Sequence, residues 1–105
     1  MKYTSQFGGE QYDLYFKTAK YANNGSTAVQ AYTESGEPYA TVSVNLEESV
    51  GCKEYEFYAD INNCEDLVNS MIDSGYIKEV GDLGFSGFCV YPKVVLTPKF
   101  LAQYV

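Results

Sequence analysis

The chain has 105 residues, a length typical of one domain, and its 46% hydrophobic and 20% charged residues indicate a globular protein rather than a disordered one. Fourteen acidic side chains against seven lysines give a formal charge of −7, and the sequence has no arginine and no histidine. This charge excludes direct nucleic-acid binding, which needs several cations to displace counterions, and favours a basic partner. The absence of histidine removes the commonest general base and zinc ligand. We therefore expect a single domain over residues 1–105 that is not an enzyme and holds neither a metal nor another cofactor.

The cellular location is predicted from features that the sequence lacks. Its N-terminal stretch KYTSQFGGEQY has no apolar segment of a signal peptide, and no apolar run approaches the roughly 20 residues of a membrane span. Cys52, Cys64 and Cys89 are odd in number and irregularly spaced, which is not the pattern of a disulfide framework. We expect a cytoplasmic protein without membrane contact, whose cysteines are reduced and packed as small hydrophobic side chains.

The first half of the chain shows the alternation of apolar and polar residues that is typical of half-buried strands. In residues 10–21, for example, Tyr12, Leu14 and Phe16 alternate with polar side chains. An Asn-Asn-Gly turn follows, because Asn and Gly both tolerate positive φ. The strands predicted from this pattern cover residues 10–21, 26–34, 39–46 and 54–61, with a hairpin turn at 35–38 between the second and the third.

The periodicity changes to that of a helix in the sequence NNCEDLVNSMIDSG. Its apolar residues recur at spacings of three and four, at Cys64, Leu67, Val68, Met71 and Ile72. Asn62 or Asn63 can serve as the N-cap, and Gly75 suits the first position after the helix. This pattern predicts the main helix at about residues 63–74.

The last third of the chain is predicted from its glycines and prolines. Residues 76–88 are typical of a glycine-punctuated loop with a short extended start, and residues 89–97 of a strand. Pro92 removes a backbone donor from that strand, so the strand should lie at a sheet edge or carry a bulge. Residues 98–105 can close as a helical turn with Pro98 at its first position.

Together these elements predict an α+β fold. A mostly antiparallel sheet of about four to six strands would carry the one main helix on one face, because this arrangement buries the apolar side of both. The order of the N-terminal residues 2–9 is left open by the sequence.

The sequence GFSGFCVYP, residues 84–92, places a thiol among glycines and aromatic side chains. A reactive Cys89 would need a lysine or a helix N-terminus nearby to favour the thiolate, and its neighbours are apolar instead, so we predict a packed thiol. The glycines here lead into a strand, whereas those of a phosphate-binding loop lead into a helix. As an alternative, the loop 81–89 could bind a small molecule or nucleotide in a pocket that includes Gly84, Phe85, Phe88 and Tyr91.

The acidic residues and the eleven tyrosines indicate an interaction surface. Tyrosine adds amphipathic contact area at low entropic cost and is enriched at interfaces. The residues predicted to contact a protein partner are Glu34, Glu37, Glu47, Glu48, Glu54, Glu56, Tyr58 and Asp60. Alternation along residues 54–61 predicts that the last four of them share one exposed strand face. Carboxylates and tyrosine hydroxyls presented together can resemble a phosphate-bearing strand to a basic groove. Ordinary solubilising charge is the alternative explanation.

Three segments, GEPYATVSVNL, YADINNCEDLVNSMIDSG and SGFCVYPKVVL, carry a resemblance to a known family. From about Tyr21 to Leu96 the chain resembles a bacterial family of small domains of unknown function that is common in gut bacteria and their mobile elements. Many members have proline after the NNC sequence, whereas this chain has Glu65, and either residue suits a first helical turn. The resemblance implies an α+β fold and a mobile-element context, and it implies no catalytic residue.

These observations favour one function and leave two others open. The favoured one is a non-enzymatic acidic interaction protein, encoded by a phage or mobile element, whose partner is a basic, nucleic-acid-binding host defence protein. It would inhibit that partner in the manner of an anti-CRISPR or antirestriction factor. One form of such inhibition is mimicry of DNA. The second is a small-molecule or nucleotide-binding domain that uses the loop 81–89. The third is a structural protein that self-associates through an exposed sheet edge. The oligomeric state is left open.

Overall fold

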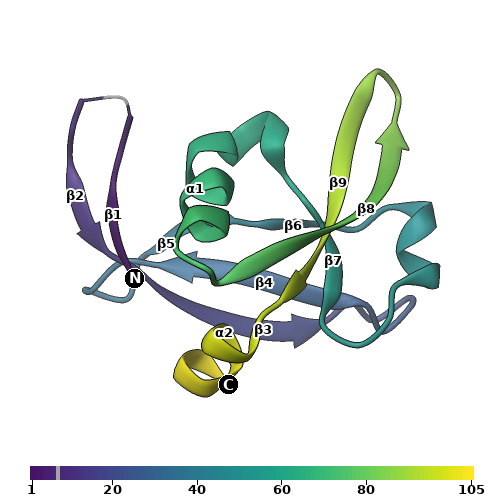
Figure 1. Ribbon diagram of the computed structural model, residues 1–105, viewed down its shortest axis with the longest axis horizontal. Helices are drawn as coiled ribbons and strands as arrows, with labels where there is room; N and C mark the ends of the chain where they lie inside the picture. Colours follow the sequence, from purple (N-terminus) through teal and green to yellow (C-terminus); the bar gives the residue numbers. More distant parts are fainter. Residues whose placement is uncertain (7) are drawn as a thin grey trace.

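The computed structural model describes residues 1–6 and 8–105, and it shows an α+β fold as predicted (Figure 1). In chain order its elements are β1 (Lys2–Thr4), β2 (Gln11–Asp13), β3 (Tyr15–Lys20), β4 (Thr27–Tyr32), β5 (Pro38–Thr41), β6 (Ser43–Val44), the 3₁₀ helix η1 (Glu47–Gly51), β7 (Glu56–Ala59), α1 (Ile61–Asp73), β8 (Ile77–Ser86), β9 (Cys89–Leu96) and α2 (Pro98–Tyr104). Helix α2 begins with the predicted proline. In the part of the chain that the structure describes, no helix is long and apolar enough to cross a membrane.

The strands pair antiparallel in three sheets, β1–β2, β3–β4–β5 and β6–β7–β9–β8, rather than in the single sheet expected. The predicted strand 39–46 accounts for part of this difference, because it divides into β5 and β6 at Val42. The Val42 N–H donates to the Val29 carbonyl of β4 at 2.9 Å, whereas the Val42 carbonyl accepts from the Asp60 N–H at 2.8 Å. The chain thus passes from one sheet to the next without a turn, which is why the sequence shows one uninterrupted pattern.

The predicted strand 10–21 divides in the same way at Leu14, between β2 and β3. Leu14 is buried, and its N–H donates to the Met1 carbonyl at 2.8 Å. The sequence left the order of residues 2–9 open, and within them Lys2–Thr4 forms β1 against β2. Phe7 lies outside the described residues.

Helix α1 starts earlier than predicted, at Ile61, and its N-cap is Asp60 rather than Asn62 or Asn63. The Asp60 carboxylate accepts from the Asn63 N–H at 3.2 Å. Aspartate caps a helix as well as asparagine does, so composition alone does not distinguish these candidates. The helix ends before Gly75, as predicted. Its apolar face is buried at Cys64, Leu67, Val68 and Met71.

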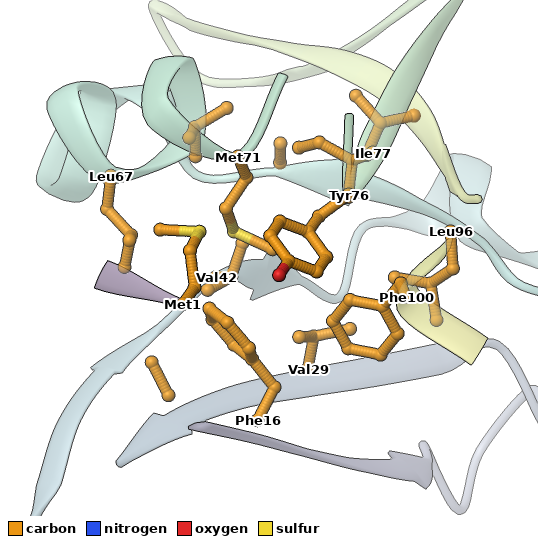
Figure 2. Close-up of a cluster of buried hydrophobic side chains, with 14 of the residues drawn as sticks. Met1, Phe16, Val29, Val42, Leu67, Met71, Tyr76, Ile77, Leu96 and Phe100 are labelled. Carbon is orange, nitrogen blue, oxygen red and sulfur yellow. The ribbon is translucent and has the colours of Figure 1, made fainter. Parts of the chain in front are cut away.

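The main core lies between α1, the sheet β3–β4–β5 and α2 (Figure 2). Leu67 and Met71 of α1 point toward the side of the core formed by Phe16 of β3 and Val29 of β4. Phe100 of α2 closes the cluster and is fully buried. Burial of each such side chain contributes about 1.5–3 kcal/mol, so this cluster is the main force that holds the separate sheets together.

The predicted loop 76–88 is wrong, because most of it forms β8, which pairs with β9 along its length. A bulge between Glu79 and Leu83 interrupts the pairing near the middle of the strand. Most β8 side chains are exposed on both faces of the sheet. Their sequence therefore lacks the alternation by which a half-buried strand is recognised.

Strand β9 lies between β7 and β8, so the edge position predicted from Pro92 is wrong. Pro92 pairs with Leu83, directly beside the bulge, so the irregularity that proline predicts occurs in the partner strand. On the other side, the pairing with β7 covers β9 only from Lys93 to Val95. Pro92 therefore lies outside the β7–β9 pairing, and its missing N–H leaves no β7 carbonyl in that pairing without a hydrogen-bond donor.

Candidate functional site

The outer half of the β8–β9 hairpin, residues 82–92, projects beyond the neighbouring strands, and we call it the arm (Figure 1). Its two strands are joined by a two-residue turn of Gly87 and Phe88. Gly87 has a φ of 58°, which suits the first central position of a type II′ hairpin turn. The cross-strand pairs beyond the turn are Ser86–Cys89, Phe85–Val90, Gly84–Tyr91 and Leu83–Pro92. Because side chains alternate along a strand, these pairs point in turn to two opposite faces.

One face of the arm packs against the body of the protein. Tyr91 lies on this face and is buried with Leu46 and Tyr58 in a second core cluster. Its cross-strand partner is Gly84, where a Cβ would lie 2.6 Å from Leu46 Cδ1 and 2.8 Å from Tyr58 Cε1. Burial raises the pKa of both tyrosine hydroxyls, which therefore stay neutral. Glycine is thus needed at this position for β8 to approach the cluster.

The opposite face of the arm is apolar and exposed. Leu83 and Phe85 of β8 are 55% and 57% exposed, and Val90, which pairs with Phe85, is 37% exposed. Phe88 at the turn is fully exposed. A strand face that meets water is normally polar, so these four residues form an unusual surface, which we call the apolar arm surface.

The same side of β9 is covered farther along the strand. Val94 and Leu96 share the orientation of Val90, because residues two apart share a face, and both are buried in the main core with α1. Helix α1 begins at Ile61, and the Asn62 side-chain amide donates to the Val90 carbonyl at 3.3 Å. Helix α1 therefore covers this side of β9 only up to its own first turn. Beyond that point the apolar side chains on the same side of β9 are exposed and belong to the arm.

The free edge of β8 is occupied in part by a carboxylate. β8 is the last strand of its sheet and has a partner strand on one side only. Glu48 of η1 accepts a hydrogen bond from the Phe85 N–H at 2.7 Å. Together with the bulge between Glu79 and Leu83, this contact makes the edge poorly suited to pairing with another strand. Contact through the arm would therefore use side chains rather than strand pairing.

Several of the predicted acidic residues act as acceptors for the protein's own backbone. Asp60 caps α1, and Glu48 accepts from β8. Glu56 accepts from the Lys53 N–H at 2.7 Å. Glu54, in contrast, is exposed. The carboxylates of strand 54–61 thus do not all face outward as one charged row.

Tyr58 is buried, which corrects the prediction that it shares an exposed face with the acidic residues around it. Its neighbours Phe57 and Ala59, on the other side of β7, are buried in the main core. β7 lies between the two core clusters, so both of its faces are covered. Alternation alone predicts one wet face, because it does not show that a second cluster covers that side.

The β4–β5 hairpin tip and η1 carry four of the predicted acidic residues, and these two segments lie at opposite ends of the fold (Figure 1). Glu34 and Glu37 are exposed at the tip of the β4–β5 hairpin, whereas Glu47 and Glu48 belong to η1 beside the arm. Glu34 and Asp13 together border two hollows of about 520 and 400 Å³. Asp13 is not among the residues predicted from the sequence, although it occupies a polar position in an alternating strand. The eight predicted residues do not form one continuous face.

The predicted ligand pocket in the loop 81–89 does not form. Phe85 and Tyr91 lie on opposite faces of the arm, because extended backbone separates alternate side chains. Phe88 projects from the turn, and Gly84 is in contact with the second core cluster. These four residues therefore do not line a common cavity.

The cysteines are three free thiols. Cys89 is half-buried and packs against the second core cluster, as predicted. Burial raises the pKa of Cys64 to about 12 and also raises the pKa of Cys52, so both are protonated at neutral pH. Among residues 1–6 and 8–105, no three or more Cys, Asp or Glu side chains are grouped to hold a metal ion. What the described surface offers is contact area and negative charge.

Comparison with known proteins identifies the family. Residues 15–104 match a family described as a domain of unknown function (DUF4313), and the chain belongs to this family. The match runs from the start of β3 to the end of α2. It includes the arm, the second core cluster and the buried residues of the main core except Met1, Tyr3 and Leu14. It agrees with the sequence resemblance to a family of unknown function. No curated protein and no solved structure matches the chain.

Proposed function

We propose that this protein is a non-enzymatic interaction protein that binds a basic, nucleic-acid-binding protein. The observation that carries the proposal is the nearly unpaired negative charge of its surface. Among the described residues, only Asp13 and Asp82 form ion pairs, with the Met1 amine at 3.6 Å and with Lys93 at 3.3 Å. Three of the seven lysines lie over tyrosine rings, namely Lys17 over Tyr32, Lys93 over Tyr58 and Lys99 over Tyr76. Most of the formal charge of −7 is therefore available to an external partner.

The chemistry of the partner follows from this charge. An acidic surface attracts positive grooves, and positive grooves are the surfaces with which proteins bind nucleic acid. The exposed carboxylates at the β4–β5 tip and at η1 would meet such a groove at two separate places. Nucleic acid and this protein would then compete for the same surface.

We further propose that the protein is encoded by a bacterial phage or mobile element and inhibits a host defence protein, as anti-CRISPR and antirestriction factors do. Two points support this context: the resemblance of the sequence to a family common in mobile elements, and the combination of small size with strong negative charge. Occupation of the nucleic-acid groove would be sufficient for inhibition, so no catalytic residue is required.

The test is a pull-down from a bacterial lysate with the tagged protein, washed at low and then high salt and challenged with duplex DNA. We expect a nuclease or another DNA-binding protein that is retained at low salt and displaced by DNA, because both treatments weaken an electrostatic contact. The charge reversals E34K/E37K and E47K/E54K test the two ends of the fold separately. K20E makes the surface more acidic and is the control that should not weaken binding. A lane without a partner, or a partner indifferent to salt and DNA, contradicts the proposal.

A further inference from the structure

We infer that the apolar arm surface (Leu83, Phe85, Phe88 and Val90) is a docking surface for a partner segment in which apolar side chains are flanked by lysine or arginine. The inference rests on the proposed function, because it assumes a basic partner, and it names the part of this protein that the partner contacts. Charge alone would attract the partner, whereas the arm would anchor it.

The exposed apolar side chains are concentrated on one hairpin. Seven large hydrophobic side chains are exposed in the described part of the chain, and five of them belong to β8, β9 and the turn between them: Val80, Leu83, Phe85, Phe88 and Val90. The other two, Val50 and Val105, lie on η1 and at the C-terminus. Single exposed apolar residues need no explanation, but a cluster of this kind is typical of an interaction site.

The fold holds this surface in place. Gly84 and Tyr91 fix the inner face of the arm against Leu46 and Tyr58, and Glu48 holds the edge of β8 at the Phe85 N–H. The outer side chains are therefore presented on a supported strand pair rather than on a loop. A surface that is ordered before binding loses less conformational entropy when a partner binds.

Charge at the border of the arm favours one kind of occupant. Glu47 and Glu48 line, together with Phe85, a hollow of about 390 Å³ at one side, and Glu79 is exposed on β8, whereas the Asp82 carboxylate is paired with Lys93. A second copy would add another formal charge of −7, and an anionic lipid surface would be repelled. A segment with apolar anchors and cationic neighbours matches both the apolar centre and the acidic border.

The experiment uses two synthetic peptides of equal length and charge, one alternating Lys with Leu and the other alternating Lys with Ser. Each is titrated into the full ¹⁵N-labelled protein and followed by NMR. We expect the Lys/Leu peptide to bind more tightly and to shift amide signals of residues 82–92. The variant L83S/F85S should weaken its binding by roughly tenfold or more, because two apolar contacts are lost.

V50S is the matched control, since Val50 is exposed but lies on η1, and it should bind the Lys/Leu peptide as the unaltered protein does. Should L83S/F85S lose its dispersed NMR spectrum, F88S replaces it, because Phe88 is fully exposed at the turn. F88S should weaken binding in the same direction, by a smaller factor.

Four outcomes overturn the inference. Equal binding of the two peptides would show that charge acts alone, and this result leaves the proposed function intact. Absence of binding by either peptide would remove the proposed function as well. A dimer in light scattering that L83S/F85S abolishes would assign the arm to a second copy. Binding to phosphatidylcholine vesicles that the same variant abolishes would assign it to lipid.

Discussion

Val94 and Val90 lie on the same face of β9, yet the first is fully buried and the second is 37% exposed. Val94 packs in the main core with α1, whereas Val90 lies at the start of that helix, where the Asn62 amide reaches its carbonyl. The two valines are chemically identical, so the helix boundary decides which of them is covered. The comparison separates a covered half of the strand, which stabilises the fold, from the arm, which has no cover within the protein.

The largest expected difference comes from the same substitution made in both halves. Leu96→Ala removes a buried side chain and should lower the free energy of unfolding by about 2–5 kcal/mol. Leu83→Ala, on the corresponding face of the arm, should change it by no more than about 0.5 kcal/mol, because Leu83 is mostly exposed. Urea unfolding of both variants measures these values. Equal losses would mean that the arm is covered in solution, which would remove the distinction between the two halves.

The attachment of the arm to the second core cluster can be broken at one position. Gly84→Ala places a Cβ within 2.6 Å of Leu46 Cδ1 and should destabilise the protein by about 1–3 kcal/mol. Gly51→Ala is the control, because a Cβ there meets nothing within 4 Å and should have little effect. Thermal unfolding gives the size of the change, and the NMR signals of Tyr91 report whether the arm has moved. A Gly84→Ala variant of unchanged stability would contradict the close packing of Gly84 against Leu46 and Tyr58.

The boundary between the two halves depends on the first turn of α1. Asp60→Ala removes the N-cap and should cost about 0.5–2 kcal/mol, with faster hydrogen exchange at the Asn63 amide. Asp73→Ala, at the other end of the same helix, is the control. It removes a negative charge near the negative end of the helix dipole, so stability should stay the same or rise slightly. Similar losses in the two variants would show that net charge, rather than capping, is responsible.

The smallest effect is expected at the side of α1 that faces away from the arm, and it depends on pH. The Tyr3 hydroxyl donates to the Asp66 carboxylate, and this hydrogen bond lowers the pKa of Asp66 below its ordinary value. A carboxyl group with a lowered pKa stabilises the folded state above its unfolded pKa, and the contribution is lost as the pH falls through the folded pKa. Tyr3→Phe should therefore be less stable than the unaltered protein at pH 7, and the two should converge in acid.

Urea unfolding between neutral and acidic pH measures this convergence. Tyr76→Phe is the matched control, because Tyr76 is also buried in the main core but its hydroxyl donates to the uncharged Gln103 amide oxygen at 2.8 Å. It should leave the acid dependence unchanged. A Tyr3→Phe difference that is equal at all pH values would assign the effect to packing rather than to Asp66.

Periodicity was sufficient to predict the elements that bury one face. The spacing of Leu67, Val68 and Met71 predicts α1, and the structure buries these three residues completely. The same criterion failed for β8, where side chains are exposed on both faces, and for Tyr58, where both faces of β7 are covered. Apolar and polar residues alternate along a strand only when one face is buried and the other is exposed to water. Neither β8 nor β7 meets this condition, so the alternation criterion does not apply to them.

The candidate site was predictable in its charge but not in its shape. Four of the predicted acidic residues are exposed, as expected for charged side chains at turns and loops: Glu34, Glu37, Glu47 and Glu54. Their separation into two ends depends on how the β4–β5 hairpin and η1 are placed by the sheets. The aromatic sequence around Cys89 predicted a pocket or a packed loop, whereas the arm is a strand pair with an exposed apolar face.

The sequence by itself determined the α+β class, the position of the main helix and the strong negative charge, because helical periodicity is local and charge is additive. Only the tertiary structure decided which apolar side chains are covered. Val90 is exposed because α1 begins beside it and does not extend over the arm. Gly84 is required because Tyr58 of another strand packs against it. Both depend on contacts between segments distant in the chain, and no local pattern specifies where such segments meet.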